Sequence, residues 1–90
     1  MDILDMTIFM DHGIVSETVF FDKVESFDWE RLRDKRVLVK GCGTTIIPPW
    51  AFMVVTARLS QFAKSIAYGN EHSAISIFRR MPKEAVDVKE

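Results

Sequence analysis

The fold is decided by a central stretch at residues 36–69, RVLVKGCGTTIIPPWAFMVVTARLSQFAKSIAYG. It opens with a short apolar run at residues 37–39, which is typical of a strand buried on both faces. Two consecutive prolines, Pro48 and Pro49, follow the next loop, and proline is tolerated in a helix only within its first turn. The stretch therefore predicts a buried strand and then a long helix, which runs to about residue 67 and ends before Gly69.

The residues before this stretch favour strands. Apolar residues alternate with others at Leu4, Met6, Ile8 and Met10, as in a half-buried strand, and residues 14–21 are rich in β-branched and aromatic side chains. The tripeptide Asp11-His12-Gly13 between the two runs has turn chemistry. We therefore expect an N-terminal β-hairpin.

Two shorter segments complete the expected elements. Ser26 or Asp28 can cap a short helical turn that ends near Leu32, and residues 73–78 alternate small or aromatic side chains with two isoleucines, as in a last strand. A strand, a helix and a second strand in this order form a parallel unit. The sequence predicts a small α/β or α+β domain over residues 1–80: a hairpin plus a strand–long helix–strand unit, in a mixed sheet with one main helix packed on it. Residues 81–90 are expected to form a flexible tail.

The composition limits the classes of function. The chain has 90 residues, 48% hydrophobic and 28% charged, which suits a single globular domain. Its 12 Lys and Arg balance 13 Asp and Glu to a net charge of -1, which argues against a nucleic-acid partner. The longest apolar run, residues 46–55, has about half the length of a membrane span. The lone Cys42 and the acidic Asp2 and Asp5, where a secretory signal would be basic, predict the cytoplasm.

The expected helix carries two apolar stripes. The stripe expected to face the sheet consists of Phe52, Val55, Leu59, Phe62, Ala63 and Ile66. A second stripe consists of Trp50, Met53, Val54 and Ala57. One interpretation is that the N-terminal hairpin or the tail covers this second stripe. The other is a subunit interface, with Phe9 or Phe20 as further contacts, because Trp and Met are enriched in interface cores.

The loop after the buried strand holds the remaining candidate for chemistry. Cys42 follows a strand and precedes a helix, a position in which a thiolate can be stabilised, and Gly43, Thr44 and Thr45 are weak candidates for ligand binding. The competing interpretation is that Cys42 is a buried, inert thiol. The loop lacks the glycine and lysine spacing of nucleotide-binding motifs. No catalytic residue, cofactor or metal site is predicted.

Several positions between residues 28 and 69 resemble a family of small bacterial proteins, the domain of unknown function 2480 family. The matching residues are Asp28-Trp29, Asp34-Lys35, Cys42, Ile46-Ile47-Pro48, Trp50-Ala51, Met53, Leu59, Phe62-Ala63-Lys64 and Gly69. The resemblance implies a cytoplasmic α/β domain with no established activity. This chain differs in its shorter length, its reduced N-terminal part and the glycines on both sides of Cys42, which suggests a dedicated accessory subunit.

Two hypotheses of function remain. The first is a non-catalytic protein that binds a protein partner, either itself or a larger complex, through the stripe at Trp50, Met53, Val54 and Ala57. The second is a thiol-dependent or small-ligand-binding domain that uses the Cys42 loop. The first is preferred because an apolar patch of this kind left in water favours aggregation.

Overall fold

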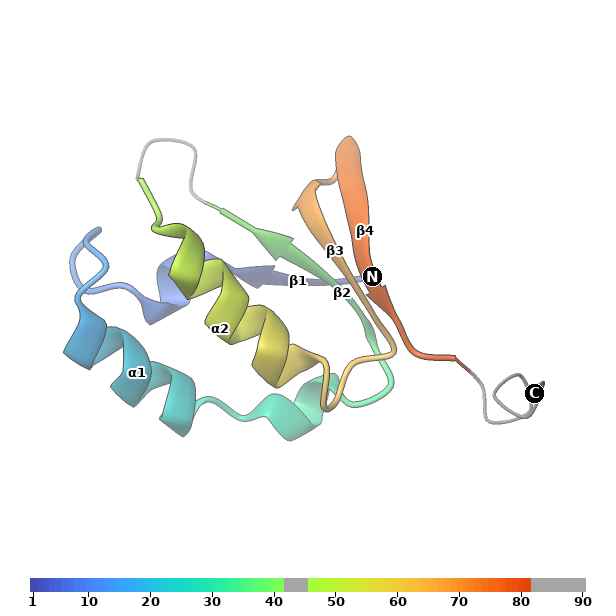
Figure 1. The fold of residues 1–90 in the computed structure, drawn as a ribbon, viewed down its shortest axis with the longest axis horizontal. Coiled ribbons are helices and arrows are strands. Elements are labelled where there is room, and N and C mark those ends of the chain that lie inside the picture. The colour runs from blue at the N-terminus through green and yellow to red at the C-terminus, as the bar shows by residue number, and fades with distance from the viewer. Residues whose placement is uncertain (42–45, 82–90) are drawn as a thin grey trace.

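The computed structural model describes residues 1–41 and 46–81, which form one small α+β domain (Figure 1). Its elements in chain order are β1 (Asp2–Asp5), η1 (Met6–Phe9), α1 (Glu17–Ser26), η2 (Trp29–Leu32), β2 (Arg36–Lys40), α2 (Pro49–Leu59), β3 (Ser65–Asn70) and β4 (Ser73–Arg79). The predicted fold class, a mixed sheet with a helix packed on it, is confirmed.

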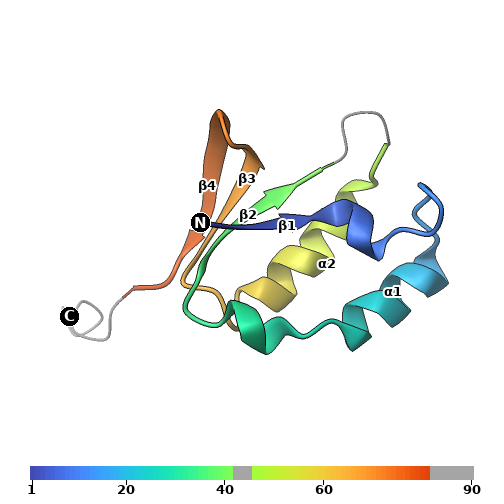
Figure 2. The same ribbon diagram turned by 180° about the vertical axis from the view of Figure 1, so that it is seen from behind.

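The strands of the described chain form a four-stranded sheet in the order β1-β2-β3-β4. β1 and β3 both pair with β2 in parallel, whereas β4 pairs with β3 antiparallel. Successive parallel strands are therefore joined by crossovers that carry α1 and α2, and right-handed crossovers in one direction place both helices on the same face of the sheet. Figures 1 and 2 show this layer of helices, with β4 at the edge farthest from α1.

The predicted N-terminal hairpin is wrong, although its first residues do form a strand. The Asp5 carboxylate accepts hydrogen bonds from the backbone N–H and the hydroxyl of Thr7, at 2.9 and 2.8 Å, and so begins the 3-10 helix η1. Met6 and Phe9 are both 1% exposed because a spacing of three residues places them on one side of that turn. Met6 and Met10 of the alternating pattern are buried, although neither belongs to a strand, because Met6 begins η1 and Met10 follows its last residue.

Residues 17–26 form the helix α1 where the second hairpin strand was expected. The predicted turn at Asp11-His12-Gly13 does exist, with positive φ at His12 and Gly13, but it leads into a helix. Phe20 and Val24 lie four residues apart and are both fully buried on the core. Packing of this face outweighs the strand preference of the β-branched and aromatic residues, which is a weak and context-dependent preference.

The helix α2 ends at Leu59, eight residues before the predicted end near residue 67. Lys64 N–H donates to the carbonyl of Lys35, at 2.8 Å, and draws the following chain into the sheet beside β2. Ile66 is thus buried from strand β3, although the sequence placed it on the helix stripe. Gly69 lies in β3 with a φ of 140°, and a Cβ there would lie 2.2 Å from the carbonyl oxygen of Ser73, so this position of the β3–β4 hairpin requires glycine.

The core lies between the sheet and the two helices. Every second strand residue points into it, as Val37, Val39 and Ile66 show, while Leu38 points to the other face. An aromatic cluster closes the end near η1, where Phe9 stacks on Trp29 with ring centroids 5.9 Å apart. The Trp29 indole N–H donates to the carbonyl of Val24 at 2.9 Å, so this buried donor is satisfied.

Candidate interaction surface

The residues of the predicted second stripe are all on α2, but they point in three directions. Val54 is half-buried against the core. Trp50 is 37% exposed and packs on α1, where its ring is parallel to that of Phe21 with centroids 5.8 Å apart. Met53, at 71% exposed, and Ala57 face outward. α1 therefore covers one side of the stripe and leaves Met53 and Ala57 accessible.

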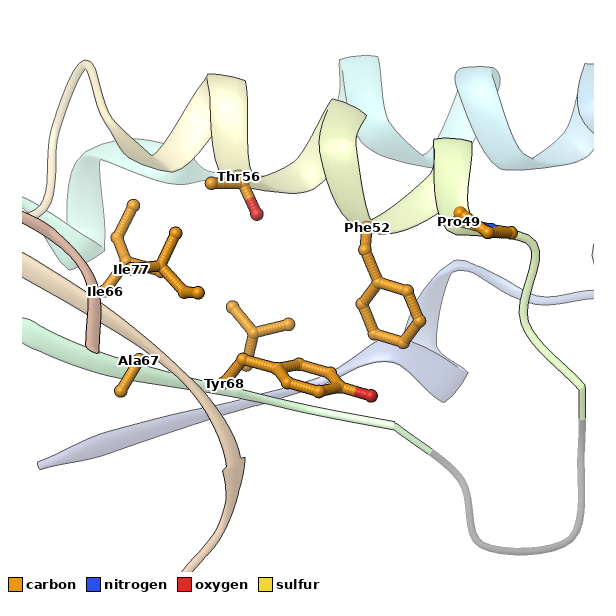
Figure 3. Close-up of a pocket in the computed structure, with 8 residues that line it drawn as sticks. Pro49, Phe52, Thr56, Ile66, Ala67, Tyr68 and Ile77 are labelled. Carbon is orange, nitrogen blue, oxygen red and sulfur yellow. The ribbon is translucent and has the colours of Figure 1, made fainter. Parts of the chain in front are cut away.

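Two adjoining hollows lie on the other side of α2, toward β3 and β4. The first, of ≈220 Å³, has Phe52, Thr56, Tyr68 and Ile77 among its lining residues. In Figure 3, Phe52 of α2 and Tyr68 of β3 point toward each other, and their rings meet edge to face with centroids 5.1 Å apart. The second hollow, of ≈360 Å³, shares Phe52, Thr56 and Ile77 and adds Met53 and Ala57.

We call this continuous surface the α2–β4 groove. Its members are Pro49, Phe52, Met53, Thr56, Ala57, Tyr68 and Ile77. Neither hollow has a charged side chain among its lining residues. The polar side-chain groups of the lining are the hydroxyls of Thr56 and Tyr68. The groove is therefore an apolar surface on which water is held by few hydrogen bonds.

The sequence interpretation missed the part of this surface that comes from β4. Ile75 and Ile77 are 64% and 52% exposed on the edge strand. A shift in pairing between Ile66 and Ala67 marks a β-bulge, and Ile77 and Phe78 lie opposite it on the helix side of the sheet. The alternation of isoleucine with small residues in 73–78 was the available signal, but it did not show which face the helices leave uncovered.

Charged groups lie at the two ends of β4. At the turn end, Glu71 lies 3.4 Å from the ammonium of Lys40. A hydrogen bond from its own backbone N–H, and then Lys40, hold the pKa of the Glu71 carboxyl below its ordinary value. At the other end, Arg79 is exposed, and Arg80 donates to the carbonyl of Ser60 at 2.7 Å.

The other predicted site residues do not join this surface. Cys42, Gly43, Thr44 and Thr45 lie outside the described residues. Phe9 and Phe20 are each 1% exposed and belong to the core, so their expected role as further interface contacts is wrong.

The described residues thus define a small α+β protein with helices on one face of a mixed sheet and an apolar groove beside the edge strand. The chain belongs to the family described as protein of unknown function DUF2480, whose profile matches residues 2–80. The match confirms the resemblance noted over residues 28–69 and extends it to most of the chain. No curated protein and no solved structure matches the chain. Among the described residues, none of the helices is long and apolar enough to cross a membrane.

Proposed function

We propose that this protein acts without catalysis of its own, through protein–protein contacts in the cytoplasm, as a homo-oligomer or as an accessory subunit of a larger assembly. The docking surface is the α2–β4 groove with the adjoining ring of Trp50. The observation that supports this proposal is the apolar, uncharged lining that α2 and β4 share across both hollows. Contiguous apolar surface rimmed by polar residues is typical of interaction sites.

The exposure of individual side chains gives the proposal its energetic basis. Met53 and Ile77 are 71% and 52% exposed on opposite walls of the groove. Complete burial of a side chain of this size contributes about 1.5–3 kcal/mol. A partner that fills the groove gains this contribution from several side chains, and the unbranched Met53 can adapt its shape to the partner.

Trp50 is suited to be a fixed anchor beside the groove. Its ring packs edge to face on Phe20, with centroids 5.2 Å apart, and is stacked on Phe21. These contacts hold one side of the indole while 37% of the residue stays exposed. A side chain that is already ordered loses little entropy on binding, and tryptophan is enriched among the residues that carry most of the affinity of an interface.

The proposal is tested by purifying the tagged protein at its native level and quantifying the proteins that accompany it. Met53→Glu places a charge in the groove, and we expect it to reduce the specific partner at least tenfold. Asp22→Lys, a charge change on the exposed side of α1, is the matched control and is expected to retain the partner. Equal recovery with Met53→Glu and wild type would exclude the groove as the docking surface.

The alternative is a thiol-dependent or small-ligand-binding domain that uses Cys42, Thr44 and Thr45. The observation that bears on it is that Gly41, which precedes this loop, lies against the ring of Phe52, and Phe52 lines the first hollow, so a small ligand in that hollow would lie beside the start of the loop. This alternative requires a thiol that alkylates rapidly at neutral pH and titrates well below about 8.5. An unreactive thiol would remove it.

A further inference from the structure

Within the part of the chain that the structure describes, one edge of β4 pairs with no other strand, and this edge has the features of a strand that pairs with another. β4 is seven residues long, and the part up to and including the bulge residue Ile77, residues 73–77, contains no charged residue. An edge strand presents unpaired N–H and C=O groups, and proteins commonly protect such edges with charges, proline or a short length. Residues 73–77 carry no charge and no proline, the bulge lies only at their last residue, and two of the isoleucines are more than half exposed.

We infer that the partner of this edge is the β4 strand of a second copy, so that two chains pair antiparallel about a twofold axis and form a continuous eight-stranded sheet. This inference rests on the proposed function, because it names the partner for one part of the docking surface. A twofold contact of this kind closes on itself and needs no second surface.

The register of this pair, meaning which residue of one β4 lies opposite which residue of the other, follows from the face of the sheet on which each side chain lies. Ile75 pairs with Tyr68 and lies on the helix side, whereas Ala74 and Ser76 pair with Gly69 and Ala67 on the other side. Residues opposite each other in an antiparallel pair lie on the same face of the sheet. An axis at Ile75 satisfies this for all five of residues 73–77, of which the last is the bulge residue. An axis at Ser76 would oppose Ala74 with Phe78, which lies on the helix side and packs on the core.

Charge supports the antiparallel arrangement. Glu71 lies in the turn before β4 and Arg79 lies at the far end of β4, so antiparallel pairing places the Glu71 end of each hairpin beside the Arg79 end of the other. Among residues 1–41 and 46–81, Arg79 forms no ion pair within its own chain. Opposite charges across paired strands stabilise the pair, so the two ends of the β4 hairpin are complementary to those of a second copy.

The other edge of the sheet does not offer an equivalent contact. β1 has four residues and carries aspartate at both ends, Asp2 and Asp5. Two copies paired through β1 would bring four carboxylates together, which is destabilising. Pairing of β4 with β1 of another chain would leave free edges at both ends and would produce an open array. Only β4 with β4 gives a closed pair without repulsion.

Cysteine cross-linking in the full chain with Cys42→Ser tests the register. Ile75→Cys is expected to form a disulfide with its own copy in high yield, because directly opposed residues have Cα atoms about 4.5–5.5 Å apart, within disulfide range. Ser73→Cys and Ile77→Cys, each two residues from the axis, have self-separations of about 14 Å and are the matched controls. Alone, neither is expected to cross-link. Mixed together, the two are expected to form a heterologous disulfide, because Ser73 lies opposite Ile77.

The solution mass of the wild-type chain gives a readout without mutation. A dimer at micromolar concentration is expected, weakened at least threefold by Arg79→Glu and restored by the charge exchange Glu71→Arg with Arg79→Glu. A monomeric wild type, or an Ile75→Cys disulfide yield no higher than that of Ser73→Cys, overturns self-pairing. If Met53→Glu still loses a different protein partner in that case, the proposed function stands and only its second-copy partner is refuted.

Discussion

Trp29 shows at the scale of a single residue how the core is specified. Its buried indole N–H donates to the carbonyl of Val24 at 2.9 Å, whereas the ring of Trp50 is 37% exposed. Trp29→Phe removes this donor and leaves the carbonyl with only the longer bond from the Phe27 N–H, at 3.4 Å, so we expect the free energy of unfolding to fall by about 0.5–1.5 kcal/mol. Trp50→Phe is the matched control and should cost less. Urea denaturation measures both, and equal losses would contradict this role of the hydrogen bond.

Gly69 and Gly13 both have positive φ, but their surroundings differ. A Cβ at Gly69 would lie 2.2 Å from the carbonyl oxygen of Ser73, whereas a Cβ at Gly13 meets no atom within 4 Å. Gly69→Ala should therefore lower the free energy of unfolding by at least about 2 kcal/mol through combined strain and clash. Gly13→Ala carries only the backbone strain and should cost about 1 kcal/mol. Thermal unfolding of the two variants measures both losses of stability. A loss in Gly13→Ala as large as that in Gly69→Ala would refute the role of the close contact between position 69 and the Ser73 carbonyl oxygen.

The ion pair of Glu30 and Arg33 predicts a dependence of stability on pH. Two hydrogen bonds from Arg33, at 2.9 and 2.7 Å, hold the pKa of Glu30 below its ordinary value of 4.5. The unfolded chain then binds more protons in acid, so this stabilisation is present above pH 4.5 and is lost as the pH falls through the lower folded-state pKa. Between pH 7 and pH 3 the urea midpoint should fall slightly more for wild type than for Glu30→Gln. Asp22→Asn is the control. A larger fall of the urea midpoint in Glu30→Gln than in wild type would contradict the predicted direction of the pH dependence.

At the scale of the element, the centre of the chain was predictable and its flanks were not. The buried strand at residues 37–39 and the helix that begins at the prolines were correct, because a short apolar run and proline at a helix start are local signals. α1 was taken for a strand because its β-branched and aromatic residues have strand preference, while the burial of Phe20 and Val24 depends on distant packing partners. The end of α2 at Leu59 depends on a backbone bond to Lys35, which no local pattern reveals.

The candidate interaction surface was also predictable only in part. Met53 and Ala57 could be recognised as outward residues from their spacing on α2. The contribution of Ile77 could not, because it requires knowing that the sheet extends one strand beyond the helices. Sequence patterns show which residues are apolar, and only the arrangement of elements shows which of them stay uncovered.

α1 itself provides a test at this scale. Phe20 is 1% exposed and contacts Phe9 and Trp50 edge to face, whereas the neighbouring Phe21 is 38% exposed. Phe20→Ala should lower the free energy of unfolding by about 3–5 kcal/mol, because it opens a cavity where α1 meets the core. Phe21→Ala should cost clearly less. Chemical denaturation followed by circular dichroism measures the pair, and the reverse order would mean that α1 presents its other face to the core.

At the scale of the whole molecule, the helices cover one face of the sheet and stop short of β4 (Figure 1). The consequence is a groove with one wall from α2 and one from the edge strand, and both walls are apolar. A two-layer domain of this kind completes its layer of helices or pairs its free edge through another chain. We therefore attribute the groove and the edge to association with other protein chains.

The central claim is that another protein chain covers the α2–β4 groove in the cell. The most direct measurement places a photo-activated cross-linking amino acid at Met53 and, as control, at the exposed Asp22 of α1, in the protein at its native level. We expect irradiation to give a discrete protein adduct from position 53 and none from position 22. The same adducts from both positions, or no protein adduct at position 53, would contradict the claim.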